Sequence, residues 1–182
     1  KKLEWFHQND LLDLIKNNYK YFVPILKDRL QVTDETCLII GDKGYPVARG
    51  ATITTGCYML AAEELELEYD VVLQTPKNIG EHADENVIEA LLNLPEKNVV
   101  IATLSGKFGS LNGIGKSFRK FCMAKKHRFA SAMDLKYLNN KQYNAFVNTV
   151  NTNYELLNQR AKFLKTIFDD ASELKVTTPA GT

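Results

Sequence analysis

Short apolar runs alternate along this chain with segments whose apolar residues recur at helical spacing. Each run is brief and is bounded by turn residues, as expected of a strand buried in a sheet. The runs cover residues 36–40, 69–74, 99–104, 128–132 and 174–177. Strands that alternate with helices form parallel sheets, joined by right-handed crossovers. The sequence therefore predicts an α/β fold: a three-layer Rossmann-like domain with a mainly parallel sheet of about five strands and helices on both faces.

The helical spacing is clearest between these runs. It predicts helices over residues 51–65, 84–94, 118–122, 143–150 and 157–168. Apolar residues from Leu11 to Leu30 repeat at the same spacing, and Pro24 interrupts them, which predicts two helices or one helix kinked there. Asp84 has the residue type and position of a helix N-cap. We expect one compact unit, with leading helices in 1–31 and strand–helix alternation over 36–178.

Composition narrows the function classes. The formal net charge of +1 gives no global field for a nucleic acid or an anionic membrane, and neither partner is expected. No apolar run approaches the length of a membrane span. Cys37, Cys57 and Cys122 are odd in number and lack the spacing of a zinc site, so we expect buried thiols in a reducing, cytoplasmic protein.

Two glycine-rich loops follow predicted strands, over residues 41–50 and 106–115. Ligands of open α/β sheets gather at the carboxyl ends of strands. The candidate ligand or cleft residues there are Asp42, Lys43, Gly44, Ser105, Lys107 and Lys116. The glycines of the first loop are too widely spaced for a dinucleotide fingerprint, and Ser110 stands where a P-loop needs glycine. Simple backbone turns are favoured, although a helix N-terminus can still hold an anion.

A basic stretch follows the second loop. It contains Lys116, Arg119, Lys120, Lys125, Lys126, His127 and Arg128. We interpret it as the solvated face of a helix with Phe118 and Phe121 buried beneath, in preference to a phosphate contact, because no second patch supports nucleic-acid binding.

The histidines give no strong motif. Glu81 and His82 stand beside Asp84 and Glu85, but acidic residues at a helix start are explained by the helix dipole, and a metal site usually has paired histidines. His7 lies beside Trp5 and Phe6, where packing is the favoured role.

Ser105, His127 and Asp134 have the residue types of a catalytic triad. No G-x-S-x-G elbow accompanies them, so residue type alone carries almost no weight.

Both ends of the chain carry a family resemblance. Residues 30–42, LQVTDETCLIIGD, resemble the entry to the first strand in the M29 family, the aminopeptidase T or thermophilic aminopeptidase family. Residues 176–182, VTTPAGT, resemble the inter-domain segment of that family, where the chain continues Asp-Leu. The long helical region from Tyr143 to Phe168 is similar too. The chain is expected to be cut near this segment, 174–182, and both of its ends are read as cuts.

This resemblance implies an N-terminal α/β domain of a two-domain metalloaminopeptidase, which releases N-terminal residues from peptides. The paired divalent metal ions, of the zinc or cobalt class, would belong to the C-terminal catalytic domain, where they bind substrate and activate water. No position here matches a family metal ligand, so no catalytic or metal-binding residue and no cofactor is assigned to this fragment. Its implied partners are that missing domain and a second copy in a homodimer, and its implied role is to shape the cleft.

Two other readings remain open. The glycine-rich loops allow a nucleotide- or phosphate-binding α/β module. The chain also allows an interaction or dimerisation domain that takes no small ligand.

Overall fold

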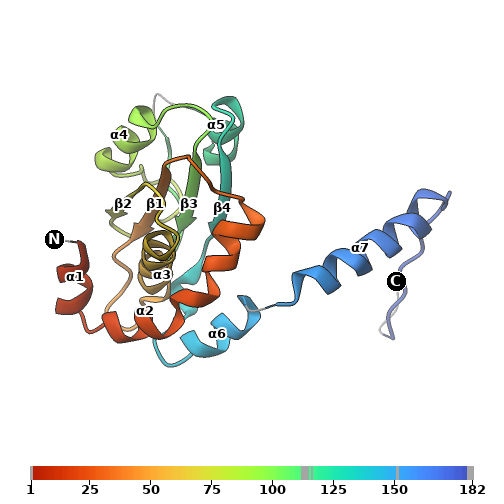
Figure 1. Cartoon of the computed structure of the whole chain (residues 1–182), viewed down its shortest axis with the longest axis horizontal. Helices are drawn as coiled ribbons and strands as arrows, with labels where there is room; N and C mark the ends of the chain where they lie inside the picture. Colours follow the sequence, from red (N-terminus) through yellow and green to blue (C-terminus); the bar gives the residue numbers. More distant parts are fainter. Residues whose placement is uncertain (1, 112–114, 116, 151, 180–182) are drawn as a thin grey trace. The chain divides into compact units, whose positions relative to one another are not determined.

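Four parallel strands form the centre of the fold in the order β2-β1-β3-β4 (Figure 1). They are β1 Cys37–Asp42, β2 Tyr69–Gln74, β3 Val99–Thr103 and β4 Arg128–Ala132. Cys37 stands opposite both Tyr69 and Val99, and Val99 stands opposite Arg128, so the four strands start in register. The predicted α/β architecture with a parallel sheet is confirmed.

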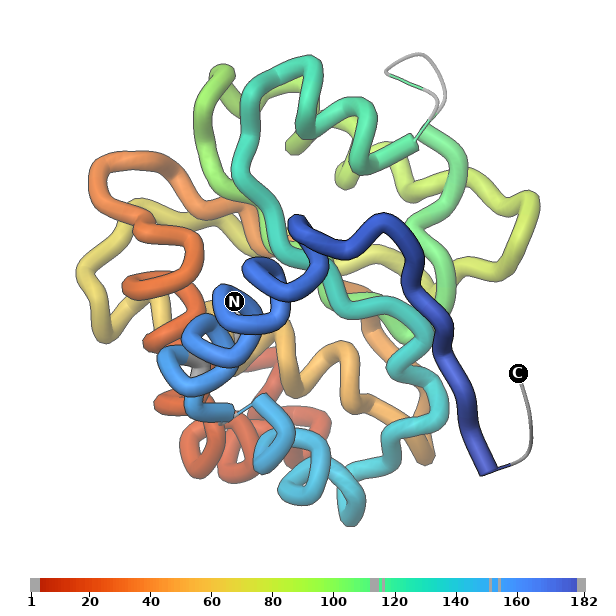
Figure 2. Tube along the Cα trace, turned by 90° about the vertical axis from the view of Figure 1, so that its right-hand side faces the viewer, coloured from red at the N-terminus to blue at the C-terminus, as the bar shows by residue number. Residues whose placement is uncertain are grey.

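Helices cover both faces of this sheet. One face carries α1 Lys2–Gln8, α2 Leu12–Asn18, α3 Gly50–Glu64 and α6 Tyr143–Val150. The short 3-10 helix η1 Tyr19–Tyr21 and the π-helix η2 Ile25–Arg29 lie on the same face. The other face carries α4 Glu85–Asn93 and α5 Phe118–Ala124. Figures 1 and 2 show α5 on one side of the sheet and the red N-terminal helices on the other.

Alternate side chains of the central strands feed two separate cores. Ile39 and Ile101 pack under α2 and α3, whereas Leu38 and Val100 pack under α4 and α5. All four are 2% exposed or less. Burial on both faces explains why these strands are continuous apolar runs, because a strand with one wet face would alternate with polar residues.

Helix α3 lies unusually close to β1. A Cβ atom on Gly41 would lie 2.0 Å from Oγ1 of Thr55, so only glycine fits at this point of contact. The Thr55 hydroxyl is 2.7 Å from that of Thr103 on β3 and donates to the Ala51 carbonyl at 2.9 Å. Small residues and satisfied hydroxyls thus let the helix sit directly over the strands whose ends carry the candidate site.

Helix boundaries follow local chemistry. Asp84 occupies the N-cap position of α4, as predicted, but its side chain makes no capping hydrogen bond. Pro24 precedes η2, and α2 ends earlier, at Asn18, so the expected break near Pro24 is present. Asn153 caps helix α7 Tyr154–Asp169 by accepting from the Leu156 amide at 3.0 Å.

The structure is a computed structural model that describes residues 2–111, 115, 117–150 and 152–179. The chain divides into two compact units, Lys1–Val150, which holds the sheet, and Asn151–Thr182, which holds α7. No helix among the described residues is long and apolar enough to cross a bilayer.

The prediction of a fifth strand at 174–177 is wrong. These residues form no strand, and Leu174 and Val176 are 60% and 79% exposed. A strand is held by the backbone of a neighbouring strand. The described part of unit Asn151–Thr182 contains a helix and no strand to pair with, so β-propensity alone leaves the segment irregular.

The three cysteines are buried and unbridged, as predicted. Burial raises the pKa of each of the Cys37, Cys57 and Cys122 thiols to about 12. Such thiols are inert packing groups at neutral pH.

His127 lies just before β4, at the amino edge of the sheet, whereas Ser105 and Asp134 follow the carboxyl ends of β3 and β4. The three residues therefore cannot form a triad.

The His127 ring is buried, and its Nδ1 accepts from the Asn98 amide at 3.1 Å. Among the described residues its Nε2 has no hydrogen-bond partner. Burial lowers the pKa of His127, and the nearby Lys125 charge acts in the same direction.

This burial makes stability depend on pH. Because the folded pKa of His127 lies below the unfolded one, protons bind the unfolded chain first as pH falls through the unfolded pKa. The His127 contribution to stability is complete above that pKa and declines below it. In urea denaturation at pH 7.5 and pH 5.5, His127→Gln should lose less stability on acidification than the wild type. Equal losses in the two chains would contradict this assignment.

Candidate functional site

The carboxyl ends of β1 and β3 are tied together by one buried carboxylate. Asp42 ends β1, and Ser105 follows β3. One carboxylate oxygen of Asp42, Oδ2, accepts from the Ser105 amide at 2.6 Å, and Oδ1 accepts from the Ser105 hydroxyl at 2.7 Å and from the Gly44 amide at 2.9 Å. The strand order reverses between β1 and β3, which is where open α/β sheets usually take ligands.

The hydrogen bonds between Asp42 and Ser105 are closed off from solvent. Asp42 and Ser105 are both 0% exposed. Burial raises the pKa of Asp42, and the hydrogen bonds from Ser105 and Gly44 oppose that rise. Every oxygen of the carboxylate already has a donor, so the predicted candidates Asp42 and Ser105 meet as a structural clamp with no face open to a ligand.

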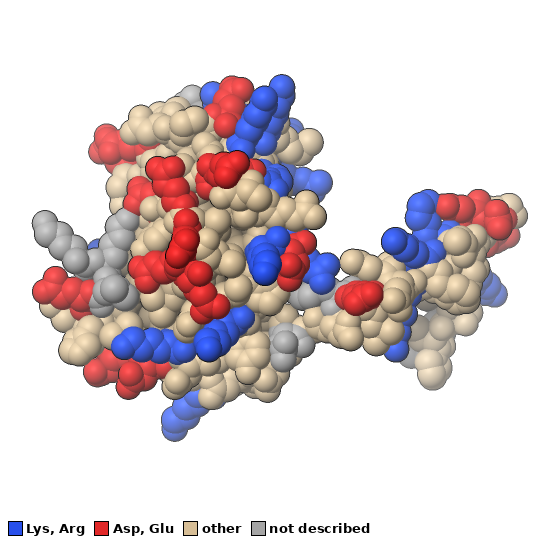
Figure 3. All heavy atoms as spheres, viewed as in Figure 1, with Lys and Arg blue, Asp and Glu red and all other residues tan. Residues whose placement is uncertain are grey.

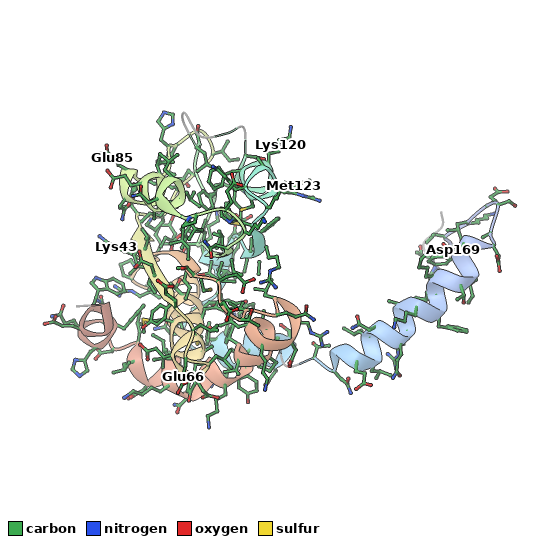
Figure 4. The ribbon with its side chains drawn as sticks, turned by 45° about the horizontal axis from the view of Figure 1, so that its top comes forward. Lys43, Glu66, Glu85, Lys120, Met123 and Asp169 are labelled. Carbon is green, nitrogen blue, oxygen red and sulfur yellow. The ribbon has the colours of Figure 1, made fainter. Side chains whose placement is uncertain are left out.

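The other predicted residues separate from this clamp. Gly44 adopts a positive φ of 62°, which lets its amide turn back to Asp42. Lys43 is exposed at the surface (Figure 4), and its amide donates to the Gln74 carbonyl at 3.0 Å. Lys116 lies outside the described residues. Lys107 lines a cavity beside the clamp.

The loops after β2 and β3 form the rim of that cavity. Gln74, fully buried at the end of β2, donates to the Phe108 carbonyl at 3.1 Å and accepts from the Asp84 amide at 3.3 Å. The Lys107 amide donates to the Lys77 carbonyl at 2.9 Å. A Cβ atom on Gly106 would lie 2.4 Å from that same carbonyl oxygen, so glycine is required where the two loops meet.

The cavity has a volume of about 430 Å³. Its lining comes from the loops after β2, β3 and β4: Lys77, Asn78, Ile79, Gly106, Lys107, Asp134 and Lys136. Lys107 Nζ is 2.8 Å from an Asp134 carboxylate oxygen, and Lys77 is paired with Asp84. Sequence analysis named Lys107 but missed Lys77 and Lys136, although the rule that selected Lys107 applies equally to residues after the second and fourth strands.

The acidic cluster near His82 makes its hydrogen bonds with groups of the neighbouring loops. Burial opposes ionisation of Asp84, but hydrogen bonds from Lys77 and from the Thr75 amide and hydroxyl hold its pKa below the usual range. His82 is exposed and pairs by its backbone with Ser110. Across the described residues, no three His, Cys, Asp or Glu side chains are grouped as a metal site requires.

The part of the basic stretch on α5 is a solvated helix face, as predicted, with Arg119 and Lys120 exposed. Lys116 lies outside the described residues, His127 is buried before β4, and Arg128 lies in β4 and pairs with Glu35. Phe118 and Phe121 are buried beneath α5, at 9% and 4% exposure. Lys120 and Met123 lie on its outer side (Figure 4), and Lys and Arg side chains gather over the α5 part of the molecule (Figure 3). These charges lie apart from the lining of the 430 Å³ cavity.

The fold and the site together define a Rossmann-like α/β domain whose switch point is closed by its own hydrogen bonds. No protein-family model, curated protein or solved structure matches the chain significantly. Its chemistry is therefore inferred from the residues themselves.

Removing the clamp should destabilise the fold strongly. Asp42→Ala leaves the buried Ser105 amide and hydroxyl and the half-buried Gly44 amide without their acceptor, at a cost of about 2–4 kcal/mol in the free energy of unfolding. The adjacent exposed change Lys43→Ala should cost no more than about 0.5 kcal/mol. Urea denaturation of both variants checks this. An Asp42→Ala variant as stable as Lys43→Ala would show that the clamp contributes little.

Proposed function

We propose that this chain is the non-catalytic N-terminal domain of an M29-like metal-dependent aminopeptidase. The parent enzyme releases N-terminal residues from peptides with two divalent metal ions bound in its other domain. Support comes from the resemblance of segments 30–42 and 176–182 to that family. The closed clamp at Asp42 and Ser105 also suits a supporting role, because its carboxylate is occupied by internal donors.

The observation that carries the proposal is the apolar surface of unit Asn151–Thr182. Leu157, Leu164 and Phe168 recur along α7 at intervals of seven and four residues, and Leu156, Phe163 and Ile167 form a parallel stripe beside them. These six side chains are 41–66% exposed. Exposed apolar patches of this kind mark surfaces that another protein surface covers.

The irregular segment after α7 fits the same role. Leu174 and Val176 are exposed in a run of strand-forming residues, and the described residues of this unit include no strand with which the run could pair. A sheet edge or groove in a following domain would satisfy both its backbone and its apolar side chains. We assign α7 and residues 174–176 to the junction with the catalytic domain and to the homodimer, with the sheet domain shaping one side of the cleft. The buried, unbridged thiols fit a cytoplasmic protein.

The decisive experiment compares this 182-residue chain with the chain extended to the end of its gene. Both are loaded with zinc or cobalt, and release of p-nitroaniline from leucyl-p-nitroanilide is measured. The extended chain should turn over in a metal-dependent manner, and the short chain should fold without turnover. A folded, metal-loaded and inactive extended chain would overturn the assigned activity. Turnover by the short chain would contradict the proposal that this domain is non-catalytic.

A matched pair of substitutions in the extended chain tests the role of α7. Phe163→Glu places a charge in the apolar stripe, whereas Asn158→Glu places the same charge on the polar side of the helix. Phe163→Glu should reduce both activity and dimer content in sedimentation, and Asn158→Glu should leave both unchanged. Equal behaviour of the two variants would show that the stripe is not an interface.

A further inference from the structure

Three lysines from three different loops line the 430 Å³ cavity at the carboxyl edge of the sheet. Lys77 follows β2, Lys107 follows β3, and Lys136 follows β4. We propose that this cavity binds a small phosphate-class anion, with these ammonium groups as its donors. The inference does not depend on the proposed aminopeptidase role, because these three lysines are not part of the argument for that role.

The charges around the cavity are not balanced. Lys77 is paired with Asp84, and its side chain is only 13% exposed. Lys107 and Lys136 share Asp134: Lys107 is at hydrogen-bond distance, and the charges of both lysines lower the pKa of that carboxyl. The Lys136 ammonium lies 5.3 Å from the ring centroid of Tyr137. Three ammonium groups thus face two carboxylates, which leaves one positive charge for a ligand to neutralise.

The walls are held in place before any ligand arrives. The Lys107 amide donates to the Lys77 carbonyl at 2.9 Å, and the Lys136 amide donates to the Ser105 carbonyl at 2.9 Å. Ser105 is in turn fixed by Asp42 at the buried clamp. Because backbone hydrogen bonds join the three loops, the lysines are brought together at little further entropic cost on binding.

The size and shape favour a small ligand over a polymer. A cavity of this volume falls within the usual range for small-molecule sites. Lysine ammoniums bind phosphate as point charges with several donors, and three of them can surround one tetrahedral anion. Nucleic acid would need an extended basic stripe, and the exposed lysines of α5 lie outside this cavity.

The test is isothermal titration of the chain with inorganic pyrophosphate and with inorganic phosphate at low ionic strength. Saturable binding at one site is expected. Lys136→Gln should weaken binding about tenfold, since it removes one charge-assisted hydrogen bond. Lys120→Gln removes an equal charge from α5 and should leave affinity unchanged. No heat with either anion, or equal weakening by the two variants, would overturn the proposal.

A gain of affinity gives a second and sharper readout. Asp134→Asn removes the carboxylate that competes for Lys107 and Lys136, so it should tighten pyrophosphate binding several-fold. A purely structural role for the Lys107–Asp134 pair would give no such gain. Unchanged or weaker binding by a correctly folded Asp134→Asn chain would contradict the site, whatever the effect of Lys136→Gln on folding.

Discussion

The buried carboxylate of Asp42 is the constraint on which the rest of this structure depends. It holds the Ser105 amide and hydroxyl and the Gly44 amide at once, so it fixes the loops that leave β1 and β3. Burying an ionised group is costly unless hydrogen bonds compensate for lost hydration. Here the three donors supply that compensation, and the cost that remains appears as a raised pKa. Because Gly106 and Lys107 directly follow Ser105, the clamp also positions part of the lining of the lysine-lined cavity.

Because the switch point is closed, the accessible polar side chains lie in the loops around it. In many open α/β sheets the crevice between the diverging loops takes the ligand. In this chain internal donors fill that position, and accessible polar groups gather instead over the ends of β2, β3 and β4. The apolar surface of α7 is a separate feature, in a separate unit. The proposed interface role of α7 and the proposed anion site therefore rest on different residues, although both proposals also refer to the Asp42–Ser105 clamp.

Burial on both faces makes the central strands β1 and β3 continuous apolar runs that the sequence shows directly. The edge strands are only partly buried, and their place between helical segments predicted them. Residues 69–74 and 128–132 coincide with β2 and β4. The segment 174–177 has the same strand-forming composition, but the described part of its unit holds a helix and no strand, and pairing is a tertiary property that a single segment cannot encode. The sequence predicted both residues of the clamp, Asp42 and Ser105, as site candidates. It did not predict their contact, because that contact depends on the register of β1 against β3. Lys136 follows β4, so the strand-end rule that selected Lys107 reaches it too, but only the fold shows that it shares a cavity with Lys77 and Lys107.

Amide hydrogen exchange at Ser105 tests the central claim most directly. If the clamp is part of the cooperative core, the Ser105 amide should exchange only through global unfolding, with the same opening free energy as the Ile101 amide in β3. Exchange through a local opening, several kcal/mol easier than global unfolding, would show that the loop after β3 moves freely and that Asp42 does not hold it.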